Sequence, residues 1–141
     1  DVLSRAKSLI VAVKAPLAEV KSTQEKVLEQ NADYLSRGAL KQLEDRNKRE
    51  LNARERSGIM EALASARTLM RDVLLTPTTI YVVNEDVRDT IGRLAAATNV
   101  AGATRALEAV ATAERNIARN VTPQLAIEVM LFDIRKALKC R

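Results

Sequence analysis

The sequence predicts an all-α fold, a compact bundle of about six or seven helices joined by short turns. Apolar residues recur at helical spacing over most of the 141 residues. The apolar fraction of 47% consists mainly of Ala, Leu, Val and Ile, and aromatic residues make up only 2%. This composition suits closely packed helices better than a sheet-based core. With 4 Gly and 3 Pro, the chain has few residues that would interrupt a helix.

The N-terminal part predicts two helices with a joint between them. Helical spacing runs from Val2 to Leu28 but meets Pro16, which we place in the first turn of the second helix, with the joint at Lys14 and Ala15. The pattern loosens from Asn31 to Gly38, where a break is expected. Because the chain opens without Met, we expect a fragment in which residues 1–36 are helices leading from a preceding domain and residues 37–141 form the main helical domain.

The middle of the chain predicts a charged helix that becomes strongly apolar. Only three large apolar residues occur before Ile59, and a wide apolar stripe follows: Ile59, Met60, Leu63, Ala66, Leu69, Met70, Val73 and Leu74. The pattern leaves open whether Gly58 breaks this helix. Thr76-Pro77 should end it, and residues 80–83 are interpreted as a connection tucked against the core, since they have no second strand to pair with.

Three further helices are expected after this connection. Asn84, followed by two acids, predicts an N-cap for a helix that buries Val87, Ile91, Leu94 and Ala95. Asn99 or Gly102 should begin the next helix, with Leu107, Val110, Ala113 and Ile117 facing inward. Glu114 lies close to that stripe and would need a basic partner or water. Thr122-Pro123 predicts the start of the final helix.

The final helix, Thr122 to Leu138, is apolar on two faces. One broad face suits a core and comprises Ala126, Ile127, Met130, Leu131, Ile134, Ala137 and Leu138. A second stripe on another side consists of Leu125, Val129 and Phe132, and Lys136 continues its line. This stripe is a candidate subunit interface. The alternative is that a second layer of the same domain covers it.

The inventory of side chains argues against catalysis. There is no His and the single Cys is Cys140, which excludes a His/Cys metal site and a Ser-His or Cys-His nucleophile. No glycine lies in a phosphate-binding loop. We therefore expect no enzymatic activity, cofactor or metal. With no run of 18 apolar residues, no signal-peptide pattern and one thiol, we expect a cytoplasmic protein without a membrane partner.

The net charge of +5 raises the question of nucleic acid. Residues 37–56 hold seven basic and four acidic side chains, and the candidate basic patch within them is Arg46, Lys48, Arg49, Arg54 and Arg56. Interleaved acids weaken a phosphate-binding interpretation, and no aromatic residue lies among them to stack a base. We favour a solvated helix face, with contact to DNA or to an acidic partner as the alternative.

Several segments together resemble a known family. They are Leu43-Glu44-Asp45-Arg46-Asn47-Lys48-Arg49, Arg71-Asp72-Val73-Leu74-Leu75, Val82-Val83-Asn84, Arg93-Leu94-Ala95-Ala96-Ala97, Ala113 to Asn120, and above all the segment from Asn120 through Pro123 to Glu128. This pattern resembles the C-terminal collar domain of bacterial clamp-loader subunits. The charged run from Leu43 to Arg49 that leads into the buried helix is similar to the delta-prime subunit of DNA polymerase III as it occurs in high-GC Gram-positive bacteria. The resemblance covers residues 37–141 well and the first 36 loosely.

The resemblance implies a fragment of a larger, non-hydrolysing subunit. In that family the collar joins five subunits into a ring, so that the loader can place the sliding clamp on primed DNA. The implied partners are the gamma/tau and delta subunits, with clamp and DNA reached through the whole complex. A gamma/tau collar, a basic nucleic-acid-binding domain using the candidate basic patch and an unrelated helical adaptor stay open as alternatives.

Overall fold

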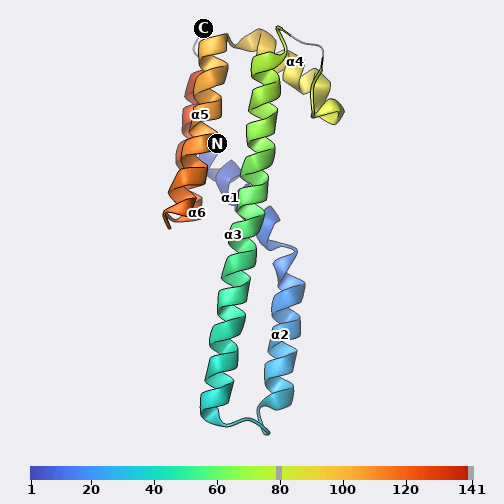
Figure 1. Ribbon diagram of the computed structural model, residues 1–141, viewed down its shortest axis with the longest axis vertical. Coiled ribbons are helices and arrows are strands. Elements are labelled where there is room, and N and C mark those ends of the chain that lie inside the picture. Colours follow the sequence, from blue (N-terminus) through green and yellow to red (C-terminus); the bar gives the residue numbers. More distant parts are fainter. Residues whose placement is uncertain (79–80, 140–141) are drawn as a thin grey trace. The chain divides into compact units, whose positions relative to one another are not determined.

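The computed structural model describes residues 1–78 and 81–139, and confirms the all-α prediction. These residues form six α-helices and one short 3-10 helix, without a strand (Figure 1). The elements are α1 (Val2–Lys14), α2 (Leu17–Asn31), α3 (Arg37–Leu75), η1 (Glu85–Val87), α4 (Arg88–Ala97), α5 (Val100–Ala118) and α6 (Pro123–Lys139). The expected breaks at Pro16, after Asn31 and at Thr76 are all present.

Two compact units make up the chain. The first comprises Asp1–Lys7 and Met60–Arg141, and the second comprises Ser8–Ile59. The boundary after Ile59 therefore lies inside α3, whereas the sequence suggested a boundary at residues 36 and 37. The role of residues 1–36 as a connection from a preceding domain stays a prediction.

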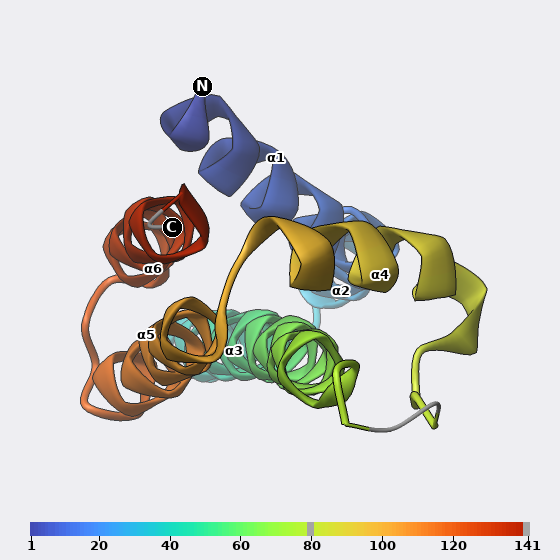
Figure 2. The same ribbon diagram turned by 90° about the horizontal axis from the view of Figure 1, so that it is seen from above.

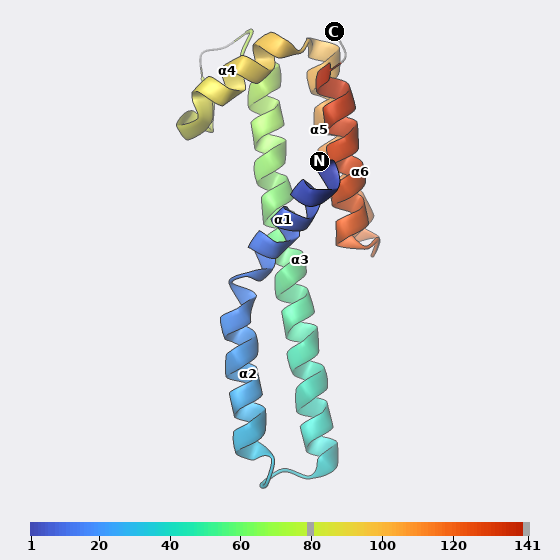
Figure 3. The same cartoon turned by 180° about the vertical axis from the view of Figure 1, so that it is seen from behind.

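The second unit is a helical hairpin with a thin apolar seam. In it, α2 lies beside the first part of α3 (Figures 1 and 3). Within residues 8–59, all of which the structure describes, only Ile59 is fully buried. Polar contacts supplement the seam, since Gln24 Nε2 donates to Glu50 Oε2 at 3.0 Å and Lys14 Nζ lies 3.2 Å from Glu55 Oε1.

Gly58 does not interrupt α3, which settles the question that the sequence left open. A Cβ atom at this position would lie 2.9 Å from Cγ1 of Val13 in α1. Glycine therefore allows α1 to approach α3 closely here, which offsets its lower helix propensity.

The first unit holds most of the core. The apolar stripe predicted along α3 is buried or half-buried throughout. Val73 forms a cluster with Val82, Ile91 and Ala103, and half-buried Leu69, Leu74, Leu94 and Ala95 surround it. Among the described residues of the connection after α3, only Val82 belongs to this core, because Tyr81 and Val83 are 71% and 51% exposed. Ile80 lies outside the described residues.

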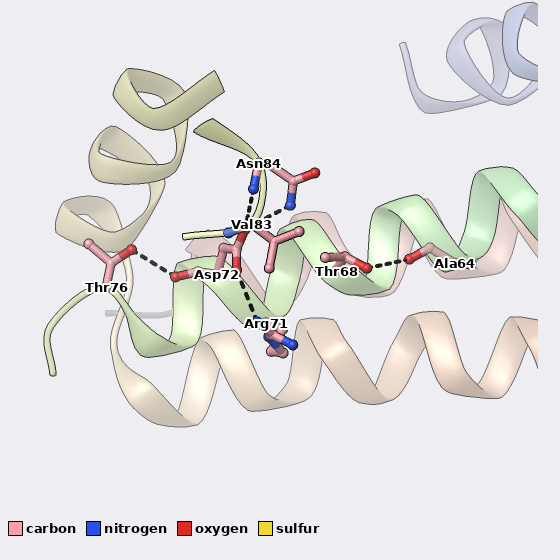
Figure 4. A network of polar contacts seen from close by, with 7 residues as sticks. All are labelled: Ala64, Thr68, Arg71, Asp72, Thr76, Val83 and Asn84. Carbon is pink, nitrogen blue, oxygen red and sulfur yellow. Dashed lines mark hydrogen bonds and ion pairs between the residues drawn. The ribbon is translucent and has the colours of Figure 1, made fainter. Parts of the chain in front are cut away.

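A buried carboxylate joins the end of α3 to that connection (Figure 4). Asp72 is 1% exposed, and its Oδ2 accepts hydrogen bonds from Val83 N at 3.0 Å, Asn84 N at 2.9 Å and Asn84 Nδ2 at 2.7 Å. An Arg71 guanidinium nitrogen lies 3.8 Å from the other oxygen. The segment before α4 is thus held to α3 by polar contacts as well as by Val82.

Two details predicted for this region are wrong. Asn84 makes no side-chain cap, and its amide donates to Asp72 instead of accepting a hydrogen bond from the helix. The chain enters α4 through the 3-10 turn Glu85–Val87, and Val87 is 36% exposed rather than buried. The Asn84 side chain binds the carboxylate of Asp72 in α3 and therefore does not cap the helix that follows it. The residues next to Asn84 in the sequence give no sign of this contact.

The pKa of Asp72 reflects two opposing effects. Burial raises it by disfavouring the charged form, but the hydrogen bonds from Asn84 and Val83, with the Arg71 guanidinium, together lower the pKa below its ordinary value of 3.8. A group with a depressed folded-state pKa stabilises the fold above its unfolded pKa, and that contribution is lost as the pH falls through the folded value.

We expect Asp72→Ala to lower the free energy of unfolding by about 2–3 kcal/mol, because three donors lose a charged acceptor. Urea unfolding near neutral pH measures this loss, and exposed Asp33→Ala is the control, with an expected change within about 0.5 kcal/mol. In the unsubstituted chain, stability should fall more steeply with acidification below the unfolded pKa of 3.8 than in Asp72→Asn. Equal acid sensitivity of these two chains would contradict the assignment.

A second glycine marks a close contact between α5 and α6. A Cβ atom on Gly102 of α5 would lie 2.8 Å from the backbone carbonyl oxygen of Ala137 in α6 and would also clash with Thr98 Oγ1. Backbone atoms cannot move aside as a side chain can. We expect Gly102→Ala to destabilise the chain by about 1–3 kcal/mol in urea unfolding.

The matched control is Gly92→Ala in α4, where a Cβ would meet nothing within 4 Å. This change should stabilise the chain by up to about 1 kcal/mol, because alanine is the better helix former. If Gly102→Ala were stabilising too, the close approach of α5 and α6 would be disproved.

Candidate interaction surface on α6

The surface is presented by a hairpin of α5 and α6, which lie side by side (Figures 1 and 3). Of the two starts that the sequence left open for α5, the structure has Asn99, which caps the helix with its Oδ1 accepting from Gly102 N at 2.8 Å. The buried residues of α5 are mostly small: Gly102, Ala103, Ala106, Ala109, Val110, Ala113 and Ile117. Small side chains let the two helix backbones come close, so that α6 is held along its length.

The turn between the helices is fixed by backbone geometry. Asn120 has φ 64°, the left-handed conformation that asparagine tolerates better than most residues. Its N–H donates to Ile117 O at 3.0 Å, and Val121 N donates to Asn116 O at 3.0 Å. These two bonds close α5 in a Schellman motif. The final helix then begins at Pro123, in agreement with the sequence.

The core-facing side of α6 is the one that the sequence predicted. Ala126, Ile127, Met130 and Ala137 are buried, while Leu131, Ile134 and Leu138 are half-buried. On the flank away from α5, the beginning of α1 lies near α6, and a groove there is lined by Asp1, Val2, Arg5, Leu131, Ile134 and Arg135 (Figure 2). The predicted need of Glu114 for a basic partner is also met, by Arg67 at 3.3 Å.

The second stripe of α6 is exposed. Leu125, Val129 and Phe132 are 54%, 45% and 48% exposed, so the part of the chain that the structure describes does not cover them. The alternative that a second layer of the same domain buries this stripe is therefore wrong for these residues. Whether another subunit covers the stripe stays a prediction.

A polar groove borders the stripe on the side of α5. Its walls are Arg105, Glu108, Ala109 and Thr112 of α5 and Asp133, Lys136 and Ala137 of α6, around a volume of about 400 Å³. Lys136, the predicted end of the stripe, thus belongs to this charged border. An apolar strip with charged residues along its edge has the anatomy of a protein–protein interface, in which the polar rim surrounds an apolar centre.

The candidate basic patch is only partly assembled by the structure. Arg46, Lys48, Arg49 and Arg56 are exposed on α3. Arg54 instead pairs with Glu50 at 2.8 Å. Its hydrogen bond lowers the pKa of Glu50, against a smaller opposing effect of burial, and Gln24 and Arg46 contribute further lowering. Arg54 is thus engaged with Glu50 within the hairpin.

The described residues show neither of two other kinds of site. Across residues 1–78 and 81–139, no three His, Cys, Asp or Glu side chains gather in a way that could hold a metal ion. Nor does any helix in these ranges combine the length and apolar character required to cross a bilayer. Cys140 lies outside the described residues.

Comparison with protein-family models, curated proteins and solved structures gives no significant match. The resemblance to clamp-loader collars is therefore carried by the segments quoted above.

Because the stripe is exposed, truncation of one of its side chains should hardly change the free energy of unfolding. We expect Phe132→Ala to shift the free energy of unfolding by less than about 1 kcal/mol, whereas Ile127→Ala, at a position that is 0% exposed, should cost about 2–5 kcal/mol. Urea unfolding of both variants makes the comparison. A large loss for Phe132→Ala would mean that this residue belongs to the core of its own chain.

Proposed function

We propose that this chain is a non-catalytic oligomerisation domain that binds a neighbouring subunit through the exposed stripe of α6. The observation that carries the proposal is the exposure of Leu125, Val129 and Phe132 on a helix whose other apolar face is already buried. Three large apolar side chains in line on one rigid helix form a continuous patch rather than scattered exposure. Such a patch lowers its free energy by contact with another apolar surface.

The size of the stripe indicates how large the interface must be. Phe132, about half exposed, presents roughly 100 Å², because an aromatic side chain has about 150–250 Å² of surface, and the smaller Leu125 and Val129 present less. A stable interface buries about 800 Å² on each partner. The stripe would thus supply the apolar centre, and the bordering residues of the polar groove would supply part of the rim.

We further propose that the parent protein is the delta-prime subunit of a bacterial DNA polymerase III clamp loader. Support comes from the way in which the resembling segments relate in space. Asp72 in one of them hydrogen-bonds to Val83 and Asn84 in the next, and Asn120 with Pro123 forms the turn into α6. In this proposal the neighbours are gamma/tau and delta collars in the cytoplasm, and sliding clamp and primed DNA are reached through the assembled loader.

The collar of a gamma/tau subunit is the second candidate, because that family approximates the same start of the last helix. The encoded sequence upstream of Asp1 separates the two candidates. A degenerate ATPase module would support delta-prime, and an intact phosphate-binding loop would support gamma/tau.

The assembly test uses a charge placed within the stripe. We expect Val129→Lys to weaken association of the chain with purified gamma/tau and delta subunits by at least about tenfold, since a charge would be buried without a partner. Analytical size exclusion and titration calorimetry measure the complex. The matched control is Gln124→Lys, another exposed position of α6, whose hydrogen-bond partner Glu128 at 2.9 Å can pair with the new lysine.

The two variants decide between the outcomes. Loss of assembly by Val129→Lys with normal assembly by Gln124→Lys supports the proposal. Normal assembly of both variants would mean that α6 is not the contact surface. If the unsubstituted chain did not bind these subunits, the clamp-loader assignment would be wrong, although the stripe could still bind another protein.

A further inference from the structure

The helical hairpin of residues 8–59 has its charges sorted by side. On α2 the acids Glu19, Glu25 and Glu29 outnumber Lys21 and Lys26. On α3, residues 37–56 hold seven basic side chains against four acidic ones. Negative charge thus prevails on one helix of the hairpin and positive charge on the other.

Two of the four acids in this part of α3 are engaged within the hairpin. Glu50 accepts from Gln24 of α2 and pairs with Arg54, and Glu55 lies 3.2 Å from Lys14 of α1. Glu50 is thus paired mainly with Arg54, one of the seven basic residues, while Glu55 is paired with Lys14 from outside this segment. The acids interleaved in the sequence weakened a phosphate-binding interpretation. On the folded helix, two of these four acids are engaged in contacts and oppose a phosphate less.

Four basic side chains lie on one side of α3 and form what we define as the basic face: Lys41, Lys48, Arg49 and Arg56. At 3.6 residues per turn these four fall within an arc of about 100°. All four are exposed, whereas the half-buried positions Leu43, Asn47 and Leu51 lie outside this arc. Asp45 is the one acid within the arc, and Arg46 lies outside it, near Glu50. With a rise of 1.5 Å per residue, the face extends over roughly 22 Å.

The chemistry of this face favours a nucleic-acid backbone over other anionic partners. A membrane-surface helix requires large apolar residues beside its cations, and the exposed positions around this face, Gln42, Asn52, Ala53 and Ser57, provide none. An acidic protein surface would normally be met by an interface with an apolar centre, which is also missing at these positions. Regularly spaced cations on a rigid helix suit a polymer with one negative charge at every repeat.

We propose that the basic face of α3 binds the phosphodiester backbone of nucleic acid without reading its sequence. Arginine can contact a phosphate through two parallel N–H donors, and lysine acts as a point charge. No aromatic side chain lies in residues 37–56, so base stacking contributes nothing there. This proposal is independent of α6, because its residues belong to the other unit.

The experiment titrates the whole 141-residue chain against a fluorescein-labelled duplex and a single strand of the same sequence, from about 50 to 200 mM salt, by fluorescence anisotropy. The test variant is Lys41→Gln/Lys48→Gln/Arg49→Gln. The control is Lys7→Gln/Lys21→Gln/Lys26→Gln, which removes the same number of exposed positive charges elsewhere and brings the net charge from +5 to the same value.

We expect the test variant to bind at least about tenfold more weakly at the lowest salt, and the slope of log affinity against log salt to become shallower by about 0.9 for each duplex phosphate that is no longer neutralised. The control should change affinity by no more than about threefold, as expected for nonlocal charge effects in screened solution. The salt slope of the unsubstituted chain tests for binding to phosphates without any substitution, so this part of the experiment does not depend on how well the variants fold. Similar weakening in both variants would overturn the proposal, and so would absence of binding by the unsubstituted chain.

A competitor distinguishes nucleic acid from acidic protein. Polyglutamate at the same charge concentration should leave the labelled duplex bound, because its charges are roughly 3.4 Å apart along an extended chain, about twice the spacing of about 1.7 Å along duplex DNA. Displacement as effective as that by unlabelled DNA would overturn the assignment in favour of an acidic polypeptide. Preference for the duplex or for the single strand would identify which backbone the face fits.

Discussion

The close contact between α5 and α6 is the constraint on which the candidate surface depends. A row of alanines on α5 and the absence of a Cβ at Gly102 bring the two backbones together, so that Ala126, Ile127, Met130 and Ala137 are buried. Once that face of α6 is committed, the rotation of the helix is fixed. In a helix each residue is turned by a fixed angle from the one before it. The stripe of Leu125, Val129 and Phe132 therefore keeps a fixed angle from the buried face of α6 and must point outward.

In the same unit, the buried Asp72 fixes the position of the segment that leads into α4. The segment before α4 exposes Tyr81 and Val83, and Val82 alone is buried among its described residues. A carboxylate that accepts three hydrogen bonds from Val83 and Asn84 supplies the missing order. Charged hydrogen bonds of this kind compensate for the desolvation of the carboxylate, and they specify one path of the chain more narrowly than apolar contact does.

The two units differ in how they are stabilised and in what they offer to partners. The unit containing α5 and α6 has a buried core and presents apolar surface. The hairpin of α2 and α3 has a thin seam, and polar contacts such as that between Gln24 and Glu50 join its helices. Exposed ion pairs contribute little to stability. The many charges of the hairpin are therefore better explained by binding to a charged partner than by stabilisation of the fold.

The sequence by itself determined the fold class, the helix breaks at Pro16, after Asn31 and at Thr76, and both faces of α6, because these depend on local periodicity, proline positions and capping residues. It was wrong about Asn84 and Val87, since a partner distant in sequence claimed the asparagine side chain. Only the tertiary structure decided that the stripe of α6 is uncovered and that Glu50 and Glu55 are engaged by neighbouring helices. Exposure and charge separation depend on which helix lies against which face, and that information is absent from the periodicity of any single helix.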